Sequence, residues 1–514
     1  MKKNIFYFSI ITYFIISIPF VFLPFGFDYS IFWLGGKILN NGGKLYVDFI
    51  DIKPPLLYYS FSILYFLFKN NILLYQIFNT SILIFTAITI NKLTTFFTQN
   101  QWLGFLSPIP FLFFIASFNY NYIFEPELVF SLIFCLIALL LFKKSNSIFH
   151  IVVAGILSGI AFGLKYSFGI IVVPTIIYLI TESQPQARFK LVTVYLLSFF
   201  ITSFIPFFIL YFQNGSLKDF IFIWNFLNYY QSTSILYHKN LKRISNNLEI
   251  ILGVHYSLVF SFAFFYSVWN ILKGKNDFNL SPNKYHNFLL ISLCFIFLSI
   301  VVEHQFLNYH FIRISSISSI YSGLGIYLIF KEAKSLSRKL LLILIPIAIF
   351  FIIFYTPLPR YSRTAIPTFL YFTNKEKYID YFENPTTANT LLRQHTTIAN
   401  YINTEINPSD TVIIIGGAAQ IYTMLRDCRT SAFPTSVFIL SNFKKPNDWE
   451  ERFVKELNSA KYIVIQDFDH THFFGKEISS WEAFNQNEKY KKILESKYKL
   501  TLKTFSFYVY KRRN

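Results

Sequence analysis

Long apolar stretches separated by polar segments fill the first 356 residues of the chain. Each stretch is roughly 20 residues long, which as an α-helix matches the thickness of the hydrocarbon core of a membrane. A continuous apolar stretch indicates a helix, because a helix satisfies its own backbone hydrogen bonds in lipid. The predicted spans are residues 5–23, 72–91, 102–119, 126–142, 148–164, 167–181, 191–212, 248–271, 287–302, 311–330 and 340–356. The pattern therefore predicts an α-helical polytopic membrane protein with about eleven transmembrane helices.

The first stretch follows a basic start, Met1-Lys2-Lys3, as a secretory signal peptide would. A cleaved signal peptide ends at a small-x-small site, and the residues that follow this stretch, Pro24-Phe25-Gly26-Phe27, form a poor cleavage region. We therefore expect a first helix that is retained.

The segment 55–68 is apolar but shorter, and its tyrosines and serines fit either a span or a helix lying in the membrane interface. Basic residues gather on the cytoplasmic side of membrane proteins. This rule is met if 55–68 is interfacial and the N-terminus is cytoplasmic, because the short loops near 120–125 and 303–310 then face outward and hold no Lys or Arg. The cytoplasmic basic residues are then Lys92, Lys143, Lys144, Arg188, Lys190, Lys273, Lys275, Lys331, Lys334, Arg338 and Lys339. We expect a multi-pass protein of the plasma (inner) membrane with an extracytoplasmic C-terminus.

The composition changes after Tyr355 to a mixed, charged sequence with alternating helix and strand patterns. Helices are predicted at 395–406, 449–459 and 488–497, and strands at 411–415, 462–466 and 505–510. The sequence thus predicts two domains. Residues 1–358 form a membrane domain with a long outer loop at 25–71, and residues 359–514 form a small extracytoplasmic α/β domain.

The composition agrees with a membrane protein, since 54% of the residues are hydrophobic and only 14% are charged, against about 25% charged in soluble domains. The formal net charge of +19 fits cytoplasmic loops and anionic lipid, and no nucleic-acid partner is expected. The three cysteines form no disulfide framework, because their number is odd and two of them lie within apolar stretches.

Charged residues in the first outer loop are the first candidates for chemistry, because charges near membrane depth are costly. Asp28 follows the first span closely, and Asp48, Asp51 and Lys53 follow in the same loop. The double proline after Lys53 fixes a non-helical approach to the 55–68 segment. A carboxylate can take a proton from an acceptor hydroxyl, and a lysine can bind a phosphate. The alternative role for Asp28 is that of a helix cap.

Further candidates lie at the other predicted outer turns. Glu125 and Glu127 flank a proline at the start of the fourth span, where acidic residues also suit the helix dipole. Lys165 interrupts two apolar stretches, and snorkelling to the interface is its alternative role. Tyr309 and His310 end another outer turn. No close set of His and Cys has the spacing of a zinc site.

Two motifs in the C-terminal domain are weaker signals. Gly416-Gly417 follows a predicted strand, but the G-x-G-x-x-G spacing of a nucleotide fold is absent. Residues 467–472, with the sequence DFDHTH, look like an acidic metal motif. They lie in the domain expected outside the cytoplasm, where nucleotide sugars are not available, and we expect no metal there.

Taken in order, these motifs resemble the GT-C membrane glycosyltransferases, most closely the glycosyltransferase family 39-like branch. That branch includes the protein O-mannosyltransferases and the aminoarabinose transferases of lipid A. The matching residues are Asp28-Tyr29-Ser30, Gly35 to Pro55, Glu125-Pro126, Gly155 to Lys165, Tyr309-His310-Phe311 and Ile398 to Tyr422. One departure stands out, because the family usually has Asp-Glu where this chain has Asp28-Tyr29.

The resemblance implies transfer of a hexose or pentose, with inversion, from a polyprenyl-phosphate donor to a hydroxyl of a lipid, glycan or protein at the outer face. Asp28 would be the base, and Lys53 and Lys165 would bind the donor phosphate. Asp51, Glu125, Glu127, Tyr309 and His310 would support them. A phosphate leaving group needs no proton, so one carboxylate suffices, unlike the pair in a glycosidase. No metal or other cofactor is expected.

Three alternatives remain. A transporter or lipid flippase would show repeat symmetry and helices broken at the midplane, and the sequence shows neither pattern. A non-catalytic partner in cell-surface polysaccharide assembly would use the C-terminal domain as a binding module. A phosphoethanolamine transferase would need a metal-rich, hydrolase-like domain, which the C-terminal sequence does not resemble.

Overall fold

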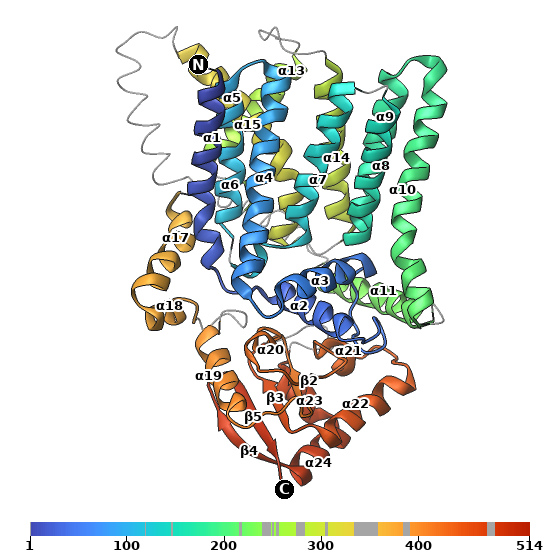
Figure 1. Cartoon of the computed structure of the whole chain (residues 1–514), viewed down its shortest axis with the longest axis vertical. Helices are drawn as coiled ribbons and strands as arrows, with labels where there is room; N and C mark the ends of the chain where they lie inside the picture. Colours follow the sequence, from blue (N-terminus) through green and yellow to red (C-terminus); the bar gives the residue numbers. More distant parts are fainter. Residues whose placement is uncertain are drawn as a thin grey trace. The chain divides into compact units, whose positions relative to one another are not determined.

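The chain forms two units, each assembled from segments that are distant in sequence (Figure 1). The computed structural model describes residues 2–118, 120–144, 147–214, 218–238, 248, 251–252, 256, 258–273, 283–303, 307–333, 358–383, 391–469 and 478–513. The first, helical unit comprises Met1–Pro24, Leu73–Ile205 and Asn240–Phe369. The second unit comprises Phe25–Ile72, Pro206–Lys239 and Leu370–Asn514. The first outer loop expected at 25–71 therefore belongs to the same unit as the C-terminal domain.

The helical unit contains the predicted membrane helices. Its described helices, of which α4, α10 and α17 extend into the second unit, are α1 (Lys2–Ser17), η1 (Ile18–Phe22), α4 (Ile72–Thr98), α5 (Gln101–Leu106), α6 (Pro108–Ala116), η2 (Tyr120–Tyr122), α7 (Pro126–Lys144), α8 (Ile148–Leu164), η3 (Tyr166–Ile171), α9 (Val172–Glu182), α10 (Pro185–Asn214), α13 (Leu258–Leu272), α14 (Asn283–Val302), η5 (Asn308–Phe311), α15 (Ile312–Ala333) and α17 (Leu358–Thr373). Ten of the eleven predicted spans overlap these helices, although 248–271 is only partly described and matches α13 from Leu258 onward. The span 340–356 lies outside the described residues.

Among the described residues, six helices are long and apolar enough to cross a membrane. They are Asn4–Phe22, Ile72–Phe96, Pro126–Lys143, Pro185–Asn214, Lys284–Val302 and Asn308–Ile329. Shorter apolar helices occupy most of the other predicted spans. The protein is therefore an integral membrane protein. The cytoplasmic location of its N-terminus stays a prediction.

Glycines allow two of these helices to approach closely. Gly155 and Gly159 lie one turn apart on α8, and a methyl group built on Gly155 would lie 2.6 Å from the Tyr195 carbonyl oxygen of α10. At Gly159 it would lie 2.7 Å from Thr202. Small residues spaced by four are typical of membrane helices packed backbone to backbone. The glycine-rich sequence before Lys165 is thus explained by packing.

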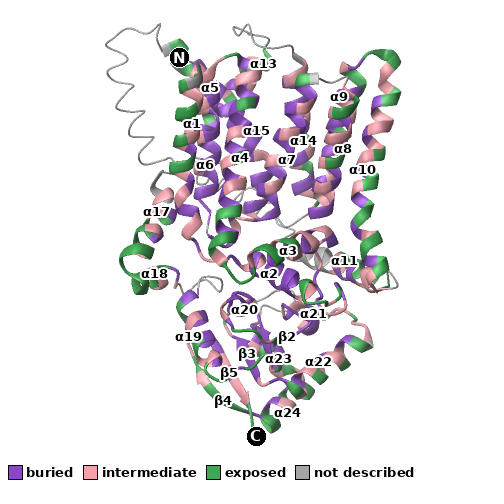
Figure 2. Cartoon of the chain, in the orientation of Figure 1, coloured by how far each residue is buried: buried purple, intermediate pink, exposed green. Residues whose placement is uncertain are grey.

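The centre of the helical unit lies at α7 and α15. In Figure 2 these helices are mostly buried, whereas α10 is mostly exposed or intermediate. In the most apolar stretch of α7 and of α15, 72% of the residues are buried, whereas the corresponding share in α10 is 22%. The residues that begin α7 and α15 are therefore surrounded by protein.

The second unit joins helices of the first outer loop to the C-terminal α/β domain. Its loop helices are α2 (Phe27–Asn40) and α3 (Pro55–Phe68), and α11 (Lys218–His238) follows α10. The predicted interfacial segment 55–68 is thus a helix of the second unit and not a member of the helical unit. Gly35 and Gly36 of α2 leave room for Tyr58 and Phe61 of α3, because a methyl group at either glycine would overlap them.

The C-terminal domain, residues 391–513, is built on a mixed sheet. Its described elements are α19 (Leu392–Asn403), β1 (Thr411–Ile415), α20 (Gln420–Met424), β2 (Arg429–Thr430), α21 (Val437–Leu440), α22 (Asn447–Ser459), β3 (Tyr462–Gln466), α23 (Ser480–Gln486), α24 (Glu488–Lys497), β4 (Tyr498–Lys503) and β5 (Phe507–Arg512), with α18 (Lys375–Tyr381) before them. The strand order is β2-β1-β3-β5-β4. Strand β1 is parallel to β2 and β3, and β5 is antiparallel to β3 and β4. The fold predicted from the sequence, a helical membrane protein with a small α/β domain, is confirmed.

Candidate active site

The first candidate site is an ion pair between Asp28 and Lys53. Helix α2 begins at Phe27 with Gly26 as its N-cap, so Asp28 lies in the first turn and is not the cap. Lys53 precedes Pro54, which is the N-cap of α3 in an extended conformation. The two charged groups meet at 3.4 Å between Lys53 Nζ and Asp28 Oδ2, and each side chain is 21% exposed. The structure therefore brings the predicted base and phosphate ligand together at an accessible position.

Asp51 has a different environment from Asp28. It is buried, its Oδ1 accepts a hydrogen bond of 2.7 Å from the Ile52 N–H, and its Oδ2 accepts one from the Tyr58 hydroxyl. Burial raises the pKa of Asp51, while the charge of Lys53 and the two hydrogen bonds oppose this rise. Asp51 therefore joins the loop to α3. Its supporting role in catalysis stays a prediction.

Tyr29 occupies the position at which the resembling family has glutamate. Its ring is buried and packs edge to face against Phe25 and Phe61, with centroid distances of 5.1 and 4.9 Å. Tyr29 thus belongs to the packed interface between α2 and α3, and Asp28 supplies the carboxylate of the pair.

The second candidate site is a buried network in the helical unit. Glu127, in the first turn of α7, lies 2.8 Å from Lys165 and 2.9 Å from Arg313 through its Oε1. Glu303, which follows α14, lies 3.1 Å from Lys165 and 2.7 Å from Arg313. His310 lies 3.3 Å from both Lys165 and Glu303. Three residues predicted from the sequence, Glu127, Lys165 and His310, therefore come together.

Opposite charges balance within this network. The two carboxylates face two cations, and the side chains of Arg313 and Glu127 are 0% and 1% exposed. Burial alone would raise the pKa of Glu303, but the charges of Arg313 and Lys165 outweigh it and hold that pKa well below its ordinary value. Buried ions are stable only when they are paired and hydrogen-bonded in this way.

Aromatic rings surround the cations. Arg313 lies over the Phe168 ring at 4.9 Å, and Lys165 lies 6.0 Å from the centroid of Tyr309. Tyr309 is stacked on Tyr122, with 5.3 Å between the centroids. The predicted residue Tyr309 is thus part of the second site. Glu125, before α7, is buried in the same unit.

Neither Arg313 nor Glu303 was selected from the sequence as a site residue. Arg313 lies within the predicted span 311–330, where a charged residue is a functional candidate by default, and that signal was available. Two serines complete its surroundings, since its Nη1 donates to Ser167 at 3.3 Å and to Ser299 at 3.2 Å. No periodicity in the sequence indicates these serine contacts.

The predicted site residues are divided between the two units. Asp28, Asp51 and Lys53 belong to the second unit. The other five, Glu125, Glu127, Lys165, Tyr309 and His310, belong to the helical unit. Their arrangement as one shared pocket stays a prediction.

The described residues contain no group of three or more His, Cys, Asp or Glu that could hold a metal ion. Of the acidic motif 467–472, residues 470–472 lie outside the described residues. The Asp469 carboxylate instead accepts hydrogen bonds of 2.6 Å from the backbone N–H and the hydroxyl of Ser480, the first residue of α23.

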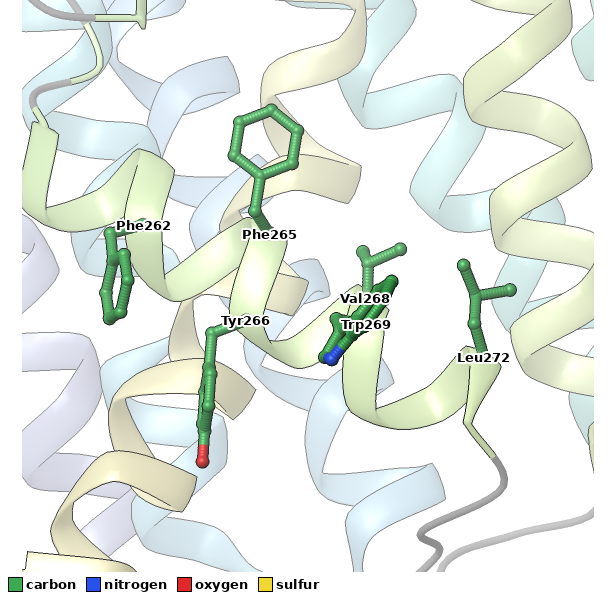
Figure 3. A pocket seen from close by; sticks show the side chains of 6 residues that line it. All are labelled: Phe262, Phe265, Tyr266, Val268, Trp269 and Leu272. Carbon is green, nitrogen blue, oxygen red and sulfur yellow. The ribbon is translucent and has the colours of Figure 1, made fainter.

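Two cavities of the helical unit are apolar. Figure 3 shows one of about 430 Å³, which a single helix, α13, lines with Phe262, Phe265, Tyr266, Val268, Trp269 and Leu272. The other, of about 320 Å³, is lined by aliphatic, aromatic and serine side chains around α13, α14 and α15. Among the described residues, neither lining includes a charged side chain, so both cavities suit apolar contacts rather than acid–base chemistry.

No protein-family model matches the sequence, and no curated protein matches it. Among solved structures, ArnT from Cupriavidus metallidurans bound to undecaprenyl phosphate is similar, with 10% sequence identity and a TM-score of 0.53 over 98% of this chain and 97% of that one. The Archaeoglobus fulgidus oligosaccharyltransferase tethered with an acceptor peptide aligns with 12% identity and a TM-score of 0.49, over 99% and 74% of the two chains. The likeness to ArnT extends over nearly the whole of both chains, and it shows that this chain has the GT-C fold.

Proposed function

We propose that the protein is a glycosyltransferase that moves a sugar from a polyprenyl-phosphate donor to an acceptor hydroxyl at the outer face of the membrane. The observation that carries the proposal is the accessible Asp28–Lys53 pair, which offers a base and a phosphate ligand 3.4 Å apart. The fold supports it, because the similar ArnT structure is described as bound to undecaprenyl phosphate. The acceptor is a lipid, a glycan or a protein.

In the proposed reaction, the donor phosphate takes the place of Asp28 beside Lys53. The ammonium then neutralises the phosphate, and the released carboxylate is ready to act as a base. Asp28 accepts the proton of the acceptor hydroxyl, whose oxygen forms a bond to C1 of the sugar. The bond between C1 and the phosphate oxygen breaks on the opposite face, so the configuration at C1 is inverted. Polyprenyl phosphate leaves without a proton, and no second carboxylate or metal is required.

The buried network supports this reaction rather than performing it. Lys165 lies within 3.1 Å of two carboxylates, so its charge is already balanced. We therefore assign the main phosphate contact to Lys53 and keep Lys165 as a second one. Glu125, Glu127, Tyr309 and His310 remain supporting residues of the proposal.

The alternatives predict different behaviour. A transporter or flippase would move a glycolipid across the membrane and leave its covalent structure unchanged. A non-catalytic partner in polysaccharide assembly would do neither. Formation of a new glycosidic bond by the purified chain separates the proposal from both.

The test uses the full-length chain in lipid vesicles with a panel of polyprenyl-phosphate sugars labelled in the sugar, together with an extract of envelope lipids, glycans and proteins. We expect one donor to transfer its label to an acceptor, with the anomeric configuration of the product inverted as read by NMR. If no donor in the panel supports transfer, the proposal is wrong. A retained configuration would refute direct displacement with Asp28 as the base.

A further inference from the structure

The C-terminal domain contacts the chain immediately before Asp28. The Phe27 ring lies over Gly417, so that a methyl group built on Gly417 would lie 3.2 Å from it. Gly416 has a φ of +133°, a conformation that favours glycine. The Gly417 N–H donates a hydrogen bond of 2.7 Å to the Gln466 side chain. The Gly416-Gly417 turn at the end of β1 therefore accommodates the start of α2, and this contact explains the motif without a nucleotide.

The same domain also contacts the loop that leads to Lys53, residues 44–53. The Ile50 N–H donates to the Ala432 carbonyl oxygen at 2.8 Å. Arg452 of α22 donates to the Val47 carbonyl oxygen through Nη1 and to Asp48 Oδ1 through Nη2, the latter at 3.3 Å. The other Asp48 oxygen accepts from the Lys44 N–H at 2.9 Å, which closes the turn. Backbone and side-chain contacts from the C-terminal domain thus define the path of this loop.

The carboxylate of Glu456 contacts both Arg452 and Ala432, the two residues that bind the 44–53 loop. Its Oε1 lies 3.4 Å from Arg452 Nε, one turn earlier on α22. It also accepts hydrogen bonds from the Ser431 hydroxyl at 2.6 Å and the Ala432 N–H at 3.3 Å. The side chain of Glu456 is 17% exposed. A single, mostly buried group therefore orients the guanidinium that binds Val47 and the peptide that binds Ile50.

Hydrogen bonds of Tyr46 within the loop connect this segment to Lys53. Tyr46, at a φ of +62°, has its N–H bonded to the Phe49 carbonyl oxygen at 2.7 Å. Its buried hydroxyl donates to the Lys53 carbonyl oxygen, also at 2.7 Å. A non-glycine residue in this conformation persists only when its surroundings hold it there. The backbone of Lys53 is thus attached to the segment that Arg452 and Ala432 fix.

We propose that Arg452 and Glu456 are positioning residues, which hold the 44–53 loop so that Lys53 faces Asp28. The inference rests on the proposed function for its catalytic consequence, although the positioning itself does not depend on it. Neither residue contacts the pair directly, so each acts through the loop. Loosening the loop displaces the Lys53 ammonium, and a misplacement of about 1 Å can cost up to roughly 100-fold in rate.

The experiment compares the wild-type chain with Arg452→Ala, Arg452→Lys and Glu456→Gln, all full-length in lipid. Lys489→Ala is the matched control. Lys489 of α24 pairs at 3.8 Å with Glu450 of α22, the helix that carries Arg452, and both side chains are about half exposed. Two readouts are taken for each variant. One is the KM for the donor with kcat, and the other is amide hydrogen exchange in residues 44–53, β1 and β3.

For Arg452→Ala we expect at least 10-fold faster exchange in residues 44–53, no change in β1 and β3, and a roughly 10-fold higher KM for the donor. Glu456→Gln should shift both readouts in the same direction. Arg452→Lys should recover part of the effect, since lysine keeps the charge but not the second hydrogen bond. Lys489→Ala should stay within about twofold of wild type, as expected for an exposed pair.

The outcomes separate this inference from the proposed function. Faster exchange in the loop with no transfer by the wild-type chain from any donor supports positioning and refutes the proposed function. Unchanged exchange in residues 44–53 overturns positioning, whatever the activity. Faster exchange that extends equally to β1 and β3 also overturns it, because Arg452 would then serve the stability of the domain as a whole.

Discussion

Carboxylates pair with cations in two different environments in this protein. One is the partly exposed Asp28–Lys53 pair, and the other is the buried network of Glu127, Lys165, Glu303 and Arg313. In the pair, both side chains are 21% exposed and meet at 3.4 Å. In the network, Arg313 is fully buried and contacts both carboxylates at 2.7 to 2.9 Å. Partly exposed charges can exchange partners with a substrate at a lower cost than fully buried ones, whereas removing one member of a buried set leaves a charge unpaired. The comparison agrees with the proposal that the pair carries the chemistry and that the network supports it.

The largest expected effect is on the pair. Asp28→Asn removes the base but keeps the shape of the side chain, so we expect transfer to fall about 10³-fold with no loss of protein from the membrane. Transfer is measured with the donor identified in the panel. Asp219→Asn is a suitable control, because Asp219 also lies in the first turn of a helix of the same unit, α11. Normal transfer by Asp28→Asn would remove the pair from the mechanism.

The next effect falls on the network and concerns stability. Arg313→Gln leaves two buried carboxylates facing one lysine, so we expect the free energy of unfolding to drop by about 3–5 kcal/mol. Thermal unfolding of the full chain in lipid measures it. The double variant Arg313→Gln with Glu127→Gln restores the balance of charge and should be more stable than the single variant. An Arg313→Gln protein as stable as wild type would contradict the view of the network as a supporting element.

A smaller effect distinguishes the two lysines. Lys53→Gln should lower kcat/KM for the donor about 100-fold through lost phosphate binding, with stability changed by less than about 1 kcal/mol. Lys53→Arg should restore part of the activity, since guanidinium also binds phosphate. Lys165→Gln should instead affect stability first, because two carboxylates depend on it. If Lys165→Gln weakens donor binding more than Lys53→Gln does, the phosphate site belongs to the network.

The pair could be predicted from the sequence more fully than the network. Asp28 and Lys53 stand out because both are charged residues of the long outer loop, Asp28 close after the first span and Lys53 directly before a double proline. Such local signals are visible in one sequence. The helices followed from apolar length, and β1 and β3 were predicted at their observed bounds, since their residues are β-branched and buried. Strand β4 was missed because four of its six residues are exposed and polar residues interrupt its apolar pattern.

Long-range contacts explain what the sequence did not predict. Arg313 contacts Glu127, which lies 186 positions away in the sequence, and Arg452 contacts Asp48, which lies 404 positions away. No periodicity encodes such partners, and they depend on how the whole chain packs. The grouping of the 25–71 loop with the C-terminal domain is of the same kind. The sequence indicated the loop and the C-terminal domain separately, and only the structure shows that the domain contacts the loop.

A buried ionisable group without a charged partner provides the last comparison with the network. His395 of α19 is 2% exposed and packs against the Phe507 ring at 5.5 Å. Among the described residues its Nε2 has no hydrogen-bond partner. Burial disfavours the charged ring and lowers the pKa of His395 to about 3. Burial without a partner therefore keeps this side chain neutral, whereas the network keeps its members charged.

This difference predicts how the stability of the C-terminal domain depends on pH. The unfolded chain binds a proton at His395 below about pH 6.5, whereas the folded chain does not until about pH 3. The unfolded state therefore binds more protons in this interval, and stability falls as the pH falls. Between pH 7 and pH 5 the loss from this one group is about 2 kcal/mol. Pulse proteolysis of the full chain, with cleavage followed within residues 391–469, measures it. His395→Leu should flatten the slope over this interval, and a variant with the wild-type slope would show that other groups set the pH dependence.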